Sequence, residues 1–155
     1  MDQMTDVERI LALEEIKRLK ARRDRALDTK DWVTYEALHL PDHHSHSDGF
    51  APWTTAAEMT ANISRILEGV TSVHHSHTPD ITFQSRDKAE AIWGMEDNLF
   101  WKQGTEDHWL RGFGFYYETY ERRDGQWKFA SRRLKRLNVK MSPGATFGPK
   151  GAGKT

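Results

Sequence analysis

The stretch HWLRGFGFYYETYERRDGQWKFASRRLKRLNV (residues 108–139) holds two long runs rich in aromatic residues, one on each side of Asp124-Gly125. An Asp-Gly pair between two such runs is a strong signal for a tight β-hairpin turn. Within the first run, successive side chains of a strand point to opposite faces. One face carries Leu110, Gly112, Gly114, Tyr116 and Tyr120, and the other carries Trp109, Phe113, Phe115 and Tyr117. We therefore predict a long antiparallel hairpin whose two faces differ in character.

The two faces of this run lead to two expectations. Gly112 and Gly114 remove side-chain volume from one face, which predicts room for a ligand there. The opposite face is aromatic throughout and needs a cover of its own. Exposed apolar bands usually mark interfaces between subunits. The sequence therefore predicts a homo-oligomer, a dimer or a trimer.

The chain before residue 70 has the pattern of three helices and one early strand. Thr5 and Glu8 form a capping box that begins a helix reaching about Leu27. Its expected buried stripe consists of Val7, Ile10, Leu13, Ile16 and Leu19. Helical spacing continues this stripe to Arg23, which either extends to solvent at the edge or lines a polar cavity.

Two shorter helices follow. Asp31 caps the first of them, and Pro41 stops it. Thr55 and Glu58 form a second capping box, which begins a helix that ends at Gly69.

From Thr71 onward the pattern is strand-like, with turn signals between the runs. Three helices followed by an antiparallel meander predict an α+β domain over residues 1–140, with a curved antiparallel sheet wrapped around the helices and a cavity between them. Residues 141–155 are rich in Gly and Pro and are expected to form a flexible tail. This tail contains a G-x-x-x-x-G-K-T match at residues 148–155. A phosphate-binding loop needs a strand before it and a helix after it, and the sequence given stops at the threonine, so we do not expect such a loop here.

Composition excludes several classes of function. The 155 residues contain 23 Lys plus Arg and 23 Asp plus Glu, so no global charge recruits nucleic acid or membranes. The chain has no cysteine, which excludes disulfides, thiolate metal sites and a cysteine nucleophile. Its N-terminus lacks the apolar core of a signal peptide, and no run of residues is long and apolar enough to cross a bilayer. We therefore expect a cytoplasmic protein.

Six of the eight histidines lie in two copies of HHSH, at residues 43–46 and 74–77. His44 and His46 would share one face of a strand, and His75 and His77 would share another. Such His-x-His pairs can ligate zinc or iron, but the sequence nominates no third ligand. We therefore expect no metal. The sequence leaves the roles of five histidines open: His43, His44, His46, His75 and His77.

His74 differs from its neighbours because strand alternation places it opposite His75 and His77, in phase with two serines. A histidine is the natural general base near neutral pH, and it works best when a carboxylate orients it. The candidate carboxylate is Asp28, at the end of the first helix. The helix dipole disfavours an acid there, and a simple turn role for Asp28 is the alternative.

The segments ALDTKDW (26–32), VHHSHTPDI (73–81) and GFGFYYETYERRDGQWKFASRR (112–133), with their spacing, resemble the SnoaL-like branch of the nuclear transport factor 2-like superfamily. Within that branch the chain is similar to scytalone dehydratase, hexachlorocyclohexane dehydrochlorinase and the bile-acid dehydratases. The resemblance covers residues 5–138. It implies a cone-shaped fold that closes a deep apolar pocket and forms homo-oligomers.

The resemblance also implies roles for individual residues. Asp28 and His74 match the catalytic pair, and Arg132 matches an arginine that assists the leaving group. Arg23 lies where several dehydratases have a tyrosine, so a cation replaces a hydroxyl that polarises a carbonyl. Trp53 and Tyr116 are expected in the wall of the substrate pocket.

Together these features predict a cofactor-independent lyase, such as a dehydratase, or an isomerase that acts on an apolar and cyclic small molecule. The alternative is a non-catalytic member of the same fold. Such members bind small ligands or serve as the small structural subunit of ring-hydroxylating dioxygenases. The Asp28/His74 pair favours the enzyme, because non-catalytic members need not keep it.

Overall fold

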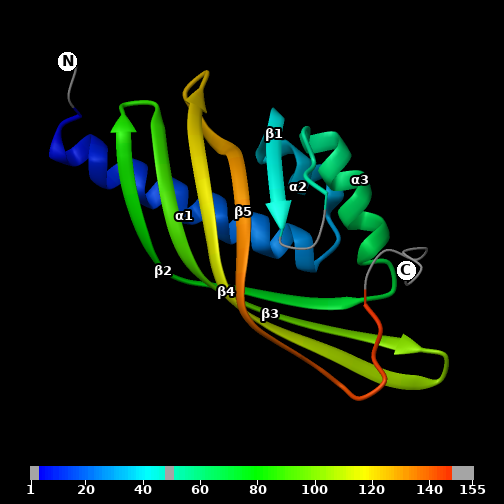
Figure 1. Ribbon diagram of the computed structural model, residues 1–155. Coiled ribbons are helices and arrows are strands. Elements are labelled where there is room, and N and C mark those ends of the chain that lie inside the picture. Colours follow the sequence, from blue (N-terminus) through cyan, green and yellow to red (C-terminus); the bar gives the residue numbers. More distant parts are fainter. Residues whose placement is uncertain (1–3, 48–50, 148–155) are drawn as a thin grey trace.

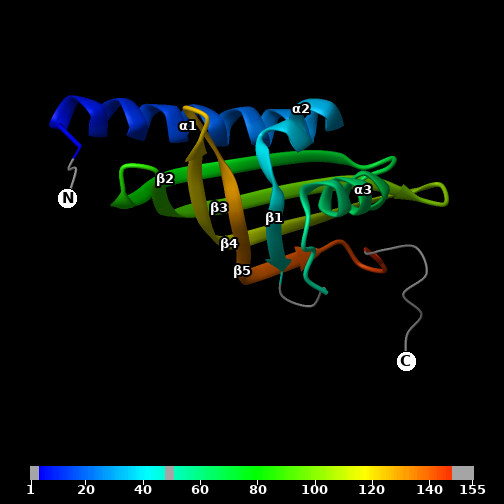
Figure 2. The ribbon, with the colours of Figure 1, turned by 90° about the horizontal axis from the view of Figure 1, so that it is seen from above.

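The computed structural model describes residues 4–47 and 51–147. Its elements, in chain order, are α1 (Asp6–Asp28), α2 (Trp32–Ala37), β1 (His39–Ser47), α3 (Ala56–Ile66), β2 (Thr71–Ser85), β3 (Lys88–Gln103), β4 (Glu106–Arg123) and β5 (Gln126–Met141). The helices lie along one face of a strongly bent sheet (Figures 1 and 2). This arrangement confirms the predicted α+β class.

The five strands form one sheet in the order β1-β5-β4-β3-β2. The β2–β3, β3–β4 and β4–β5 pairs are antiparallel, as the meander predicted. β1 differs from the prediction, because it pairs with β5 in parallel and makes the sheet mixed. The predicted hairpin is also confirmed: β4 and β5 meet at Asp124 and Gly125, which both have positive φ angles, of 50° and 76°. Two positive φ angles are typical of the tight type I′ turn.

The capping boxes account for where two helices begin. At α1 the Glu8 N–H donates to the Thr5 hydroxyl, and the Glu8 carboxylate accepts the Thr5 N–H at 2.8 Å. At α3 the Thr55 hydroxyl accepts the Glu58 N–H, but the Glu58 carboxylate accepts from Thr54 instead of Thr55. The second box is therefore only half formed as predicted.

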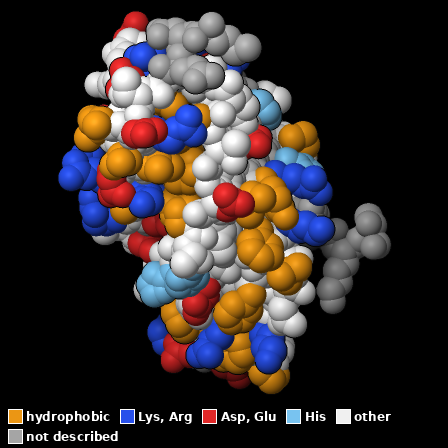
Figure 3. Space-filling model, turned by 90° about the vertical axis from the view of Figure 1, so that its left-hand side faces the viewer, with side chains coloured by type: hydrophobic (Ala, Val, Ile, Leu, Met, Phe, Trp, Pro, Cys, Tyr) orange, Lys and Arg blue, Asp and Glu red, His pale blue; other side chains and the backbone are white. Residues whose placement is uncertain are grey.

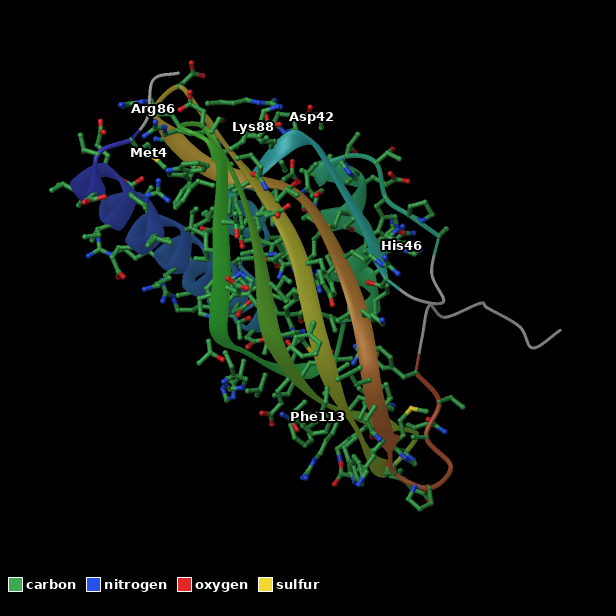
Figure 4. The ribbon with its side chains drawn as sticks, turned by 60° about the vertical axis from the view of Figure 1, so that its left-hand side comes forward. Met4, Asp42, His46, Arg86, Lys88 and Phe113 are labelled. Atoms are coloured by element: carbon green, nitrogen blue, oxygen red, sulfur yellow. The ribbon has the colours of Figure 1, made fainter. Side chains whose placement is uncertain are left out.

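The predicted buried stripe of α1 is wrong at its N-terminal end. Val7 is 67% exposed and Ile10 is 60% exposed, and burial begins at Ala12. The first turn is instead tied to the β2–β3 turn by an ion pair of 2.8 Å between Glu8 and Arg86. Figure 4 shows Arg86 beside the start of α1. Beyond this point α1 packs on the sheet through Ile16 and Leu19.

The two faces of β4 match the predicted alternation. Tyr116 and Tyr120 are buried beneath the helices, whereas Phe113, Phe115 and Tyr117 are 37–40% exposed on the outer face. Figure 3 shows hydrophobic side chains along the right-hand side of that view, interspersed with Lys and Arg. A second copy of the chain would cover this surface. The homo-oligomer stays a prediction.

The last described residues pack against the body of the protein. β5 ends at Met141, the Ser142 hydroxyl bonds the His108 ring at 2.9 Å, and the Phe147 ring lies 5.2 Å from that of Trp101. Residues 148–155, with the G-x-x-x-x-G-K-T match, lie outside the described residues. In the described part of the chain, no helix combines the length and apolar character needed to cross a membrane.

Candidate active site

Asp28 and His74 are 46 positions apart in the chain, yet they meet in the fold. The His74 Nδ1 lies 2.7 Å from Asp28 Oδ1, and the backbone N–H of His74 donates to Asp28 Oδ2 at 2.8 Å. Both carboxylate oxygens therefore hold the same residue. The side chain of His74 is 9% exposed and that of Asp28 is 22% exposed. The pair is shielded but still reachable.

The elements around the pair explain how it forms. Asp28 is the last residue of α1, and His74 lies four positions into β2, facing the helix. The Ser72 hydroxyl also donates to Asp28 at 2.9 Å, and the Lys30 ammonium donates to Ser72. Burial raises the pKa of Asp28, but the hydrogen bonds from His74 and Ser72 outweigh it and lower the pKa below its ordinary value. These donors keep Asp28 an anion despite the unfavourable end of the helix dipole.

A second contact of the same kind lies one helical turn earlier. The Ser76 hydroxyl donates to Asp24 Oδ2 at 2.6 Å, just as His74 donates to Asp28. The two contacts border an open crevice of about 570 Å³ between α1 and β2. His75 and His77 point outward from the same strand and are exposed. The phase predicted for His74 is therefore confirmed.

A larger and more aromatic hollow lies between α3 and the β3–β4 turn. Its volume is about 1640 Å³, and its aromatic lining residues are Trp53, Phe100, Trp101, Trp109 and Phe147. Thr71, three positions before His74 on β2, also borders it. In the sheet register Leu99 and Leu110 fill the row between this hollow and the row of His74. The hollow and the pair are thus neighbours, separated by the row of Ser72, Leu99 and Leu110.

Arg23 and Arg132 lie in a buried polar cluster beneath α1. Arg23 is fully buried; it donates from Nε to His39 at 3.1 Å and from Nη2 to the Tyr35 hydroxyl at 2.8 Å. Of the two alternatives for Arg23, burial in a polar environment is the one observed. The Arg132 guanidinium lies 4.3 Å above the Tyr116 ring. Tyr116 is therefore covered by a cation and borders neither the hollow nor the crevice.

The centre of this cluster is an ion pair that sequence reasoning missed. Lys20 donates to Glu118 at 2.5 Å, and the Tyr120 hydroxyl donates to the other Glu118 oxygen. Burial raises the pKa of Glu118, but the charges of Lys20 and Arg23 outweigh it and lower that pKa. The alternation of β4 places Glu118 on the buried face between Tyr116 and Tyr120. This position in the alternation of β4 was the signal in the sequence that could have identified Glu118 as a buried acid.

The prediction that two glycines leave room for a ligand is wrong. A Cβ at Gly112 would lie 1.7 Å from Arg136 Nη1, and a Cβ at Gly114 would lie 2.1 Å from the Lys135 carbonyl oxygen. The volume that the glycines release is therefore filled by the protein itself. An ion pair between Arg136 and Asp97 occupies the space over Gly112.

His43 belongs to the interior, unlike the exposed His44 and His46 on the same strand. Figure 4 shows His46 near the end of β1, away from the start of α1. His43 Nδ1 lies 3.2 Å from the Phe129 carbonyl oxygen, to which it can donate, and its ring lies 4.6 Å from that of His39. Burial and the charge of Arg23 lower the pKa of His43 to about 3. His43 is therefore uncharged at neutral pH.

This burial predicts sensitivity to acid. An unfolded His43 takes up its proton near pH 6.5 and the folded one near pH 3, so the stability present above pH 6.5 is lost as the pH falls through this window. We expect the free energy of unfolding, measured in urea, to fall from pH 7 to pH 5. His43→Gln should flatten this decline, and His44→Gln, at an exposed position, should leave it unchanged. Equal slopes in wild type and His43→Gln would contradict the assignment.

The described ranges, 4–47 and 51–147, contain no candidate cluster of metal ligands. There, no group of three or more His, Cys, Asp or Glu side chains converges on one point. His77 Nε2 lies 3.6 Å from Glu96, which gives a pair without a third ligand. The absence of a bound metal in the purified protein stays a prediction.

Comparison with known proteins gives a family and a fold. Residues 8–133 match the model of the SnoaL-like domain. A type 2 hexachlorocyclohexane dehydrochlorinase has a TM-score of 0.81 at 19% identity, over 95% of this chain and 99% of its own. A candidate scytalone dehydratase from Novosphingobium aromaticivorans has a TM-score of 0.80 at 20% identity, over 97% and 100%. A type 3 hexachlorocyclohexane dehydrochlorinase from Novosphingobium barchaimii has a TM-score of 0.76 at 18% identity, over 94% of this chain and 99% of its own. These likenesses confirm the cone-shaped fold.

Proposed function

The chain belongs to the SnoaL-like domain family, and we propose that it is a cofactor-independent lyase or isomerase acting on an apolar, cyclic small molecule. The observation that carries this proposal is the contact of 2.7 Å between His74 Nδ1 and Asp28. With Nδ1 donating to the carboxylate, the other ring nitrogen of His74 is left with a free lone pair. That nitrogen is the base.

In an elimination, His74 Nε2 removes a proton from carbon and becomes an imidazolium. The electron pair of the C–H bond forms a double bond, and the group on the adjacent carbon leaves with its electrons. Asp28 stabilises the imidazolium through the Nδ1 hydrogen bond and fixes the ring orientation. In an isomerisation, the same imidazolium returns the proton to another carbon of the substrate.

Arg23 and Arg132 are proposed to stabilise the negative charge that develops on the leaving group or an enolate. Each is buried, and each has a donor that makes no hydrogen bond within the described residues: Nη1 of Arg23, 3.7 Å from Asp24, and Nε of Arg132, 3.9 Å from Glu118. Trp53 is proposed as a wall of the substrate pocket, because it borders the aromatic hollow. The aromatic lining residues offer apolar surface to a ring-shaped substrate. The same hollow is also bordered by charged residues: Arg65, Glu68, Lys102 and Asp107.

The similar proteins suggest which compounds to test. Their names specify loss of hydrogen chloride from hexachlorocyclohexane and loss of water from scytalone. We therefore propose a panel of halogenated cyclohexanes and hydroxylated cyclic ketones, incubated with the protein in D2O. Chloride release, water loss and deuterium uptake at carbon are followed by NMR and mass spectrometry.

Asp28→Asn is expected to lower the turnover of any active panel compound by roughly 10²–10⁴-fold, because an amide no longer selects the Nδ1–H tautomer or stabilises the imidazolium. Asp42→Asn, at an exposed position, is the matched control and should retain full activity. Turnover that survives Asp28→Asn would contradict the proposal. Compounds that bind without elimination or deuterium uptake would favour the non-catalytic alternative.

A further inference from the structure

Asp97 is the residue that faces His74 across the sheet. The two are directly paired in the antiparallel β2–β3 register, and both point toward the helices. Opposite residues in such a pair have Cβ atoms about 4.5–5.5 Å apart. Asp97 is 2% exposed. A buried carboxylate therefore lies beside the imidazole, in addition to Asp28.

Arg136 neutralises this carboxylate from two strands away. Its Nη1 lies 2.9 Å from Asp97 Oδ1 and its Nη2 lies 2.6 Å from Oδ2, which is a bidentate ion pair. Arg136 is on β5 and Asp97 is on β3, so the side chain must pass over β4. It does so at Gly112, where any Cβ would collide with both partners.

A β-bulge in β5 directs the Arg136 side chain toward Gly112 and Asp97. Gly114 pairs with Arg136 but Phe113 pairs with Asn138, so Leu137 is an extra residue in the ladder. Such a bulge re-aims neighbouring side chains. The Lys135 carbonyl approaches β4 so closely at the bulge that only a glycine fits at position 114. Both glycines and the bulge thus serve one ion pair, and that ion pair lies beside His74.

We infer that Arg136 is a positioning residue that acts on His74 through Asp97, because it cancels the charge that this carboxylate places next to the imidazole. An unneutralised carboxylate there would favour the imidazolium, which cannot accept a proton. Because Arg136 cancels it, Asp28 is the carboxylate that acts on the ring. The inference deepens the proposed function, and its test requires no substrate.

The test is an NMR titration of the His74 imidazole in the full-length chain, with the pH midpoint as the readout. Arg136→Gln should raise the midpoint by about 1.5 pH units, the size expected for a unit charge at ~8 Å and an effective dielectric constant of about 20. Asp97→Asn removes the carboxylate and leaves the positive charge of Arg136 uncompensated, so it should lower the midpoint. The double variant should return close to wild type, and Arg136→Lys, which keeps the charge, should stay near it.

Arg133→Gln is the matched control, because Arg133 is exposed on the same strand, and its midpoint should equal that of wild type. Unchanged midpoints in folded Arg136→Gln and Asp97→Asn would overturn the inference. If Arg136→Gln does not fold, equal midpoints for Asp97→Asn and the double variant would overturn it. Shifted midpoints in a protein without activity would contradict the proposed function alone.

Discussion

Replacing His74 by alanine is expected to lower kcat by roughly 10²–10⁴-fold for any substrate of the panel, because the base that removes the proton is gone. Ligand binding and folding should be nearly intact. The backbone N–H of residue 74 still donates to Asp28, and Ser72 still holds the other oxygen. The measurement combines turnover, ligand dissociation constants and thermal unfolding for the variant and wild type.

His75→Ala and His77→Ala are the controls for this prediction. Both residues belong to the same HHSH copy, but their side chains are exposed on the opposite face of β2. Each should keep kcat within a few-fold of wild type. If His74→Ala remains active while either control loses activity, the proton is removed by another group and the assignment of His74 is wrong.

The largest expected loss of stability concerns Glu118. Its side chain is fully buried with that of Lys20, and both Lys20 and Tyr120 donate to it. Removing one partner of a buried ion pair leaves an uncompensated charge, which typically costs about 3–5 kcal/mol. Glu118→Gln should therefore lower the free energy of unfolding by about this amount, measured by urea denaturation at pH 7.

A second variant separates lost charge from lost packing. Lys20→Met combined with Glu118→Gln removes both charges of the pair, and such replacements are often nearly neutral. The double variant should recover most of the lost stability. Glu90→Gln, at an exposed position of β3, should change stability by less than about 0.5 kcal/mol. A double variant as unstable as Glu118→Gln would show that the ionic contact is not the cause.

The antiparallel strands could be predicted from the sequence because the patterns that indicate them are local. Alternation along β4 and the Asp124-Gly125 turn depend on residues that are neighbours in the chain. The His74–Asp28 contact joins residues 46 positions apart, and the resemblance to a family proposed it. Alternation alone gave the face of His74, but it could not give the partner.

The features that sequence reasoning missed depend on contacts between distant strands. Gly112 is indistinguishable in sequence from a glycine that opens a ligand pocket, and only Arg136, arriving from β5, shows what fills the space. The parallel pairing of β1 with β5 is likewise invisible locally. Val7 and Ile10 follow the helical stripe correctly, yet the core is reached only from Ala12 onward, so the pattern overstates the buried length of α1.

The central claim is that Asp28 holds His74 with its proton on Nδ1 and a free lone pair on Nε2. Nitrogen-15 NMR of the imidazole, recorded at a pH where the ring is neutral, measures this tautomer directly and needs no substrate. We predict a protonated Nδ1 and an unprotonated Nε2 in wild type, with the preference lost in Asp28→Asn. A neutral His74 protonated on Nε2, or a tautomer indifferent to Asp28→Asn, would contradict the account.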